Sequence, residues 1–274
     1  MVLQALVRYY DILAQEEESE ISPYGYCRAS ISYALNISKE GELLEILPLK
    51  HKVMRGKKEV EIPRSMIIPQ QVKKSSNIHS NFLCENSAYV LGIDKKGKSE
   101  RTKLCFEDFR TLHTEILSKL ECEEAKALLN FLNIWNVEEA GENEIVKPFF
   151  AELTAGANIV FKLDHGAYLQ ECPMIKKAWD DSGRKTEKEG IMQCLVTGEQ
   201  APIARLHPAI KGVKGAQTMG ASIVSFNAKA YESYGGDNRQ GFNAPISEKA
   251  AFSYGTILNH LISDRAHTLS VGDT

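Results

Sequence analysis

The chain has 274 residues, of which 43% are hydrophobic, enough to bury the core of one large domain or two modest ones. Its formal net charge of -3 gives no general attraction to phosphate, so any contact with nucleic acid must come from locally clustered Lys and Arg. No apolar run reaches the roughly 20 residues that span a bilayer, and the six scattered cysteines include no Cys-x-x-Cys pair, so we expect a soluble cytoplasmic protein with reduced thiols and no membrane partner.

The start of the chain shows a helical pattern followed by strand patterns. Apolar residues at helical spacing predict an amphipathic helix over residues 2–14, which we expect to pack on the following sheet. Alternating residues over 26–37, a Lys-Glu-Gly-Glu turn and an apolar run over 43–49 predict a β-hairpin.

Two basic stretches come next. Residues 50–58 carry Lys, His and Arg around a single glycine, which predicts a basic turn between Val53 and Val60. This turn could be a solvated hairpin tip or a phosphate contact. Residues 62–84 contain Lys and Arg but no Asp or Glu, and they end in an Asn-rich segment. Local charge is therefore positive in both stretches.

The rest of the chain mixes helical and strand patterns. Periodicity predicts helices over residues 103–120, 122–135, 168–180 and 246–262, and short strands over 158–163 and 191–197. We therefore predict an α+β fold: a mixed or antiparallel sheet with an N-terminal helix and a helical insertion around 103–137. A charged loop over 180–189 suggests two subregions, 1–180 and 190–274.

The segment from Gln200 to Tyr231 contains no Asp or Glu, which is unusual in a net acidic protein. Its cations are interleaved with glycines and with short polar side chains, so backbone N–H groups can approach a phosphate or a base edge closely. Lys and Arg bind the backbone of nucleic acids, and Asn and Gln can recognise bases. The alternative is an ordinary glycine-rich connection between two strands.

Motifs for catalysis, nucleotides or metals are weak. The glycines form neither a P-loop nor a G-x-G-x-x-G motif. Asp164 and His165 are adjacent, but such a pair is more often a surface turn than an acid–base dyad. The seven histidines and six cysteines are dispersed. We predict no catalytic residue, no metal and no cofactor.

Several segments resemble one protein family. They are MVLQALVRYY at 1–10, LPLK at 47–50, NFLCENSAYVLG at 81–92, CLVTGE at 194–199 and IARLHPAIKGV at 203–213. They are similar to the Csd family, which is the large subunit of the type I-C CRISPR surveillance complex, or Cascade.

The resemblance implies a non-catalytic subunit of a complex for antiviral defence. Family members continue beyond residue 274 into a helical C-terminal part, so this chain would be the N-terminal region of the large subunit. The implied partners are crRNA, target double-stranded DNA, the other Cascade subunits and a recruited helicase-nuclease. The implied role is to recognise a protospacer-adjacent motif in duplex DNA and to assist strand separation, while guide pairing supplies most of the sequence specificity.

Within that role we predict two groups of nucleic-acid-binding residues. The first group is Lys211, Lys214, Gln217, Ser225 and Asn227 near the motif, with Arg205 on a phosphate. The group for duplex DNA or the crRNA end is Lys57, Lys58, Lys73, Lys74, Asn77 and Asn81.

Two alternatives remain open. The acidic net charge favours a protein–protein scaffold that docks onto the crRNA-bound backbone subunits without contacting DNA itself. The second alternative is a nuclease or hydrolase that uses Asp164, His165 and neighbouring acids. Metal-dependent cleavage that is abolished by Asp164→Ala would support this hydrolase alternative.

Overall fold

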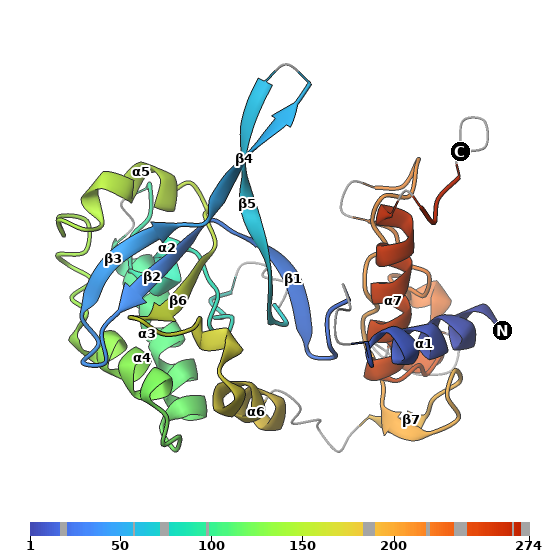
Figure 1. The fold of residues 1–274 in the computed structure, drawn as a ribbon. Helices are drawn as coiled ribbons and strands as arrows, with labels where there is room; N and C mark the ends of the chain where they lie inside the picture. Colours follow the sequence, from blue (N-terminus) through green and yellow to red (C-terminus); the bar gives the residue numbers. More distant parts are fainter. Residues whose placement is uncertain are drawn as a thin grey trace. The chain divides into compact units, whose positions relative to one another are not determined.

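The computed structural model describes residues 1–16, 21–56, 58–71, 77–96, 99–182, 190–217, 220–232, 240–264 and 266–269. The chain forms two compact units: unit 1 comprises Met1–Tyr24 with Lys185–Thr274, and unit 2 comprises Gly25–Arg184 (Figure 1). The predicted α+β class is confirmed. Within the described ranges, helices are too short or too polar to cross a membrane.

The part of unit 2 that the structure describes is built on two small sheets. The first has the order β1 (Tyr26–Ile31), β5 (Lys58–Pro69), β4 (Lys50–Arg55), and both of its pairings are antiparallel. The second has the order β3 (Leu43–Pro48), β2 (Tyr33–Ile37), β6 (Ile159–Leu163). Here β2 pairs antiparallel with β3 and parallel with β6, so this sheet is mixed.

The predicted hairpin is formed by β2 and β3, but residues 26–37 are not one strand. The chain changes sheets at Ser32: β1 before it pairs with β5, whereas β2 after it pairs with β3 and β6. The backbone of Ser32 itself forms two hydrogen bonds. Its N–H donates to the carbonyl of Asn158 at 3.0 Å, and its carbonyl accepts from the N–H of Leu49 at 2.8 Å. The alternating pattern continues through Ser32, so the sequence alone does not reveal this change.

Helices cover the mixed sheet. They are α2 (Ser87–Val90), α3 (Ser99–Leu117), α4 (Glu123–Ile134), α5 (Phe150–Leu153) and α6 (Pro173–Ser182), with 3-10 turns at Lys147–Phe149 and Leu169–Glu171. The predicted helical insertion is confirmed as α3 and α4, between β5 and β6. Their apolar faces meet the sheet in one core, where Phe109, Phe131 and Phe161 are fully buried.

His113 of α3 is fully buried in this core. Its Nδ1 lies 2.7 Å from the carbonyl oxygen of Phe109, and its Nε2 lies 2.9 Å from the backbone nitrogen of Leu83. Nδ1 therefore donates and Nε2 accepts, which fixes the neutral tautomer. Burial lowers the pKa of His113 to about 4, although the hydrogen bond to Phe109 acts in the opposite direction.

We expect this histidine to make the fold sensitive to mild acid. An unfolded histidine titrates near pH 6.5, so the contribution of His113 is complete above that pH and is lost as the pH falls toward about 4. From this group alone, the free energy of unfolding should fall by about 2 kcal/mol between pH 7 and pH 5. Urea unfolding at both pH values checks this. The His113→Gln variant should lack this pH dependence. If the variant keeps it, the pH dependence arises from another group, such as the buried His207.

Unit 1 joins the first helix to the last. Its elements are α1 (Val2–Leu13), β7 (Ile191–Gln193), β8 (Gln200–Pro202), α7 (Glu248–Ser263) and 3-10 turns at Lys229–Tyr231 and Gln240–Asn243. Leu6, Val7 and Tyr10 of α1 share a core with Ala250, Ala251, Tyr254 and Ile257 of α7. The expectation that the first helix packs on the following sheet is therefore wrong, because periodicity shows that a helix has an apolar face but not which element covers it.

Cys194 holds together the turn after β7 and the start of α7. Its sulfur accepts hydrogen bonds from the backbone N–H groups of Val196 and Thr197 at 3.4 Å and of Ser247 at 3.2 Å. The residue is fully buried. Burial raises the pKa of the Cys194 thiol, but hydrogen bonds from Ser247 and Thr197 outweigh burial and lower the pKa to about 7. Cys194 is thus a structural acceptor.

Candidate nucleic-acid interface

The β4–β5 hairpin extends well beyond the sheet that carries it, and we call it the arm (Figure 1). Its register pairs Lys50 with Pro63 and Val53 with Val60, so the predicted turn between Val53 and Val60 is the tip of a hairpin. Gly56 at the tip has a φ of +65°, which favours glycine. Successive side chains along each strand of the arm point to two opposite faces.

One face of the arm carries cations and apolar side chains but no acid. Residues that pair directly in an antiparallel sheet point to the same face, so Val60 and Ile62 share a face with their partners Val53 and His51. At the base of β5 this face is buried, with Met66 in the core. Toward the tip it becomes exposed. We call this surface the basic face; its members are His51, Val53, Lys58, Val60, Ile62 and Arg64.

Arg64 lies where the basic face leaves the core. Its side chain is exposed, and its guanidinium carbon lies 5.8 Å from the centre of the Tyr168 ring. A guanidinium over an aromatic face is held by attraction to the ring, while its N–H groups remain able to bind phosphate. Arg64 is therefore a positioned cation at the foot of the arm.

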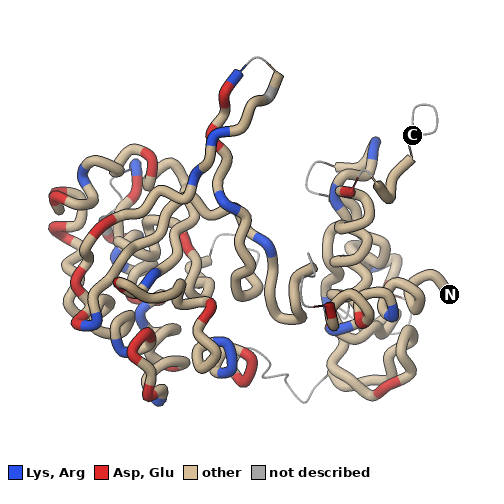
Figure 2. Tube along the Cα trace, viewed as in Figure 1, with Lys and Arg blue, Asp and Glu red and all other residues tan. Residues whose placement is uncertain are grey.

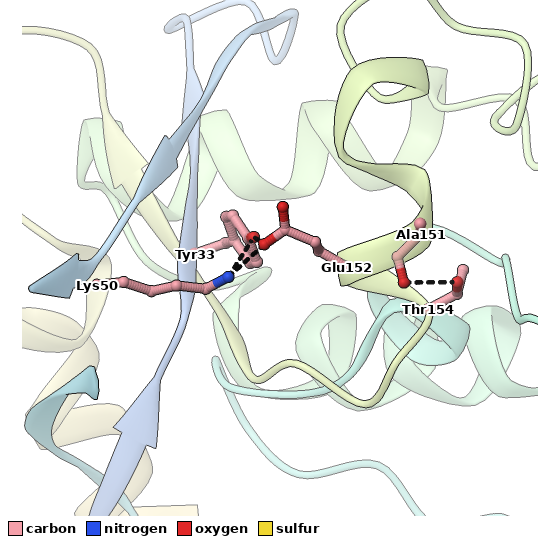
Figure 3. A network of polar contacts seen from close by, with 5 residues as sticks. All are labelled: Tyr33, Lys50, Ala151, Glu152 and Thr154. Carbon is pink, nitrogen blue, oxygen red and sulfur yellow. Dashed lines mark hydrogen bonds and ion pairs between the residues drawn. The ribbon is translucent and has the colours of Figure 1, made fainter. Parts of the chain in front are cut away.

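The opposite face of the arm carries its two glutamates, Glu59 and Glu61, and the lysines on this face form ion pairs with carboxylates. Lys52 forms an ion pair with Glu59 at 3.0 Å, and Glu61 points to the same side. At the foot, Lys50 binds the Glu152 carboxylate and donates to the Tyr33 hydroxyl at 2.8 Å (Figure 3). Figure 2 shows Lys and Arg along both strands of the arm; the register shows that only one face carries them without acids.

The network of Tyr33, Lys50 and Glu152 engages Lys50 internally. Burial raises the pKa of Tyr33, with a further rise from its hydrogen bond to Glu152. The hydrogen bonds of Glu152 with Lys50 and Tyr33 lower the pKa of its carboxyl. Burial lowers the pKa of Lys50, but the same two partners outweigh it and raise the value. Lys50 is thus a structural cation that anchors the arm to α5.

In unit 1, the acid-free segment forms a loop closed by a short antiparallel bridge between Ile210 and Ala221. The side chain of Asn259 in α7 binds the base of the loop, accepting from the Lys211 N–H at 2.7 Å and donating to the Ala209 carbonyl at 3.1 Å. Gly220 has a φ of +100°, and a Cβ there would lie 2.9 Å from the Ile210 carbonyl oxygen. The loop therefore requires glycine at this position.

Three predicted residues lie exposed on this loop: Lys211, Lys214 and Gln217. Arg205 precedes it, and Ser225 and Asn227 follow it; all three are exposed. His207, in the same segment, is buried instead, with its Nδ1 2.6 Å from the Tyr254 hydroxyl. The bridge thus places Lys211, Lys214 and Gln217 on one loop, whereas the other three predicted residues lie outside it.

The second predicted group is divided. Lys58 and Asn77 are exposed, whereas Lys57, Lys73 and Lys74 lie outside the described residues. Asn81 is only 7% exposed, and its side chain donates to the Glu85 carboxylate at 2.7 Å. It therefore lies inside unit 2. His51 and Arg64 were not among the predicted site residues, although their alternation with valine and isoleucine is visible in the sequence.

Asp164 and His165 lie at an exposed turn after β6. His165 has a side chain 95% exposed, with its Nε2 3.4 Å from the Asp164 carboxylate. The other Asp164 oxygen accepts from the Asn36 side chain at 3.0 Å. This arrangement is that of a surface turn and gives no support to the hydrolase alternative.

Comparison with known proteins assigns the chain to a family. The family model described as CRISPR-associated protein (Cas_Csd1) matches residues 6–274. No curated protein matches the chain. The match covers both units and confirms the resemblance seen in the sequence. The chain therefore belongs to the Csd1 family of CRISPR-associated proteins.

Proposed function

We propose that this chain is a non-catalytic, DNA-binding part of the large subunit of a type I-C Cascade complex. In this role it binds target duplex DNA beside the crRNA, recognises a protospacer-adjacent motif and assists strand separation. Membership of the Csd1 family supports the CRISPR role. The observation that supports DNA binding is the basic face of the arm, which presents cations without acids in an otherwise acidic chain.

A two-stranded β-ribbon is one of the two protein elements that the major groove of B-DNA admits. In this proposal, the arm enters or lies along a groove, and Lys58, Arg64 and His51 contact phosphates. The paired cations of the opposite face contribute less, because Glu59 and Glu152 already neutralise them.

The apolar members of the basic face suit strand separation. Proteins that open or kink duplexes often insert apolar side chains between base steps, at a cost of a few kcal/mol per step. Val53 and Val60 form a cross-strand pair near the tip, with Lys58 next to Val60 on the same face in position to bind the DNA backbone. In this proposal the pair acts as the wedge, and guide pairing then captures the separated strand.

The 211–220 loop supplies a second contact in unit 1. Lys211 and Lys214 bind phosphates, and the Gln217 amide is suited to base edges, as is Asn227 beyond the loop. We expect Lys211→Ala with Lys214→Ala to lower affinity about tenfold and to reduce the slope of log affinity against log salt by about two. Binding of the crRNA-loaded complex to fluorescent duplexes, measured across salt concentrations, tests this.

Two controls separate DNA binding from scaffolding. Lys249→Ala, at an exposed lysine of α7 beside Asp11, changes charge outside the loop and should leave affinity unchanged. Size-exclusion chromatography should show equal assembly for all variants. Normal assembly with unchanged DNA affinity and motif preference in loop and arm variants alike would favour the scaffold role and refute direct DNA binding.

A further inference from the structure

Three potential metal ligands meet in unit 2: two are close in the sequence at the start of α4, and the third comes from a distant part of the chain. The sulfurs of Cys122 and Cys172 and a carboxylate oxygen of Glu124 lie within 4.8 Å of one another. Both cysteines are buried, with exposed fractions of 8% and 6%, and Glu124 is partly buried. A cation here would contact all three donors and little solvent.

Both cysteines immediately precede a helix. Cys122 is the N-cap of α4, and its carbonyl accepts the N–H of Lys126 at 3.2 Å. Cys172 directly precedes Pro173, the first residue of α6, and its carbonyl accepts the N–H of Lys176 at 2.9 Å. Helix N-termini carry positive partial charge and stabilise thiolates. Two such termini therefore converge on the pair of sulfurs.

The three side chains lie so close together that ionising all of them is unfavourable when no cation is present. Burial raises the pKa of the Cys122 thiol, and Cys172 and Glu124 raise it further, whereas a hydrogen bond from the Ala125 N–H lowers it. Two thiolates and a carboxylate in a mostly buried site are stable together only if a positive ion neutralises them.

We propose that Cys122, Glu124 and Cys172 bind a thiophilic divalent cation of the zinc type. Thiolate sulfur selects such ions over Mg²⁺ and Ca²⁺, which require oxygen ligands. Zinc accepts sulfur and carboxylate together and is commonly four-coordinate, so three protein ligands leave one position for water or a further ligand. The bound ion ties the start of α4 to the start of α6. The site lies apart from the basic face and does not depend on the proposed function.

Zinc titration of the reduced full-length chain, freed of metal by a chelator, tests this site. We expect about one zinc ion bound per chain, and Co²⁺ in its place to give a thiolate-to-cobalt charge-transfer band. Loss of an outer-shell partner already lowers metal affinity about 10- to 100-fold, so Cys122→Ser and Cys172→Ser should each lower it at least about 100-fold. Affinity should rise with pH, because binding displaces the thiol protons.

Matched variants distinguish ligation from misfolding. Glu124→Gln keeps both cysteines and should lower zinc affinity about tenfold or more without changing the circular dichroism spectrum. Glu123→Gln, at the adjacent exposed glutamate that pairs with Lys39, and Cys27→Ser, at a half-buried cysteine of β1, should bind zinc as wild type does. Failure of the reduced wild-type chain to bind zinc, or an unchanged, wild-type zinc affinity in both Cys→Ser variants, overturns the proposal. So does a Cys122–Cys172 disulfide in a chain that binds no zinc once reduced.

Discussion

Replacing Lys58 and Arg64 together by alanine should lower the affinity of the crRNA-loaded complex for duplex DNA by about 10- to 100-fold and reduce the salt slope by about two. Both residues are exposed cations on the face of the arm that carries no acid. Each phosphate contact releases condensed counterions, so losing two contacts weakens binding most at low salt. Fluorescence anisotropy with labelled duplexes over a range of salt concentrations measures both quantities.

The opposite face of the same arm supplies the matched control. Lys52 is exposed but paired with Glu59, so Lys52→Ala with Glu59→Ala leaves the net charge of the arm unchanged. Exposed ion pairs of this kind contribute little to stability. We expect this variant to bind DNA within about twofold of wild type. If both double variants bind alike, the facial distribution of charge on the arm has no part in DNA binding.

Replacing Cys194 by valine should lower the free energy of unfolding of unit 1 by about 3 kcal/mol or more. Valine has a similar volume but offers no acceptor, so the buried N–H groups of Val196 and Ser247 and the partly buried N–H of Thr197 would lose their partner. A buried donor without an acceptor costs about 1–3 kcal/mol. Urea unfolding followed by circular dichroism measures the difference.

Cys194→Ser is the matched control, because its hydroxyl keeps an acceptor at the same place; it should lose less stability than the valine variant. The pH dependence supplies a second check. The thiol pKa is lowered to about 7 in the folded chain. The contribution of the ionised thiol to folding stability is therefore complete above the ordinary thiol pKa and is lost as the pH falls through 7. The difference in the free energy of unfolding between wild type and Cys194→Val should widen from pH 7 toward pH 9. A gap that is constant with pH would show that Cys194 does not titrate there.

Much of the secondary structure could be predicted from the sequence. The helix over 2–14, the helical insertion and the last helix each show apolar residues at helical spacing, and the structure places α1, α3, α4 and α7 there. The hairpin tip between Val53 and Val60 was predicted from basic residues around a glycine. These elements are local, so their patterns lie within one stretch of chain.

Long-range pairing could not be predicted in the same way. Nothing in the pattern of residues 2–14 distinguishes a sheet from α7 as the covering element. The separation of cations from acids on the arm depends on the register of β4 against β5, which sets the partner of each residue. The meeting of Cys122 with Cys172 depends on how α4 and α6 are placed in three dimensions, and dispersed cysteines gave no signal for it.

The pairing of α1 with α7 constrains how the chain can fold. Unit 2 is one continuous stretch, so it can fold on the ribosome as soon as its last strand and helix have emerged. Unit 1 must wait until α7 has been synthesised, with the apolar side of α1 uncovered in the meantime. Loop closure over such a separation is slow compared with local pairing. During synthesis, the apolar face of α1 is therefore open to other contacts for longer than it would be if its partner were local.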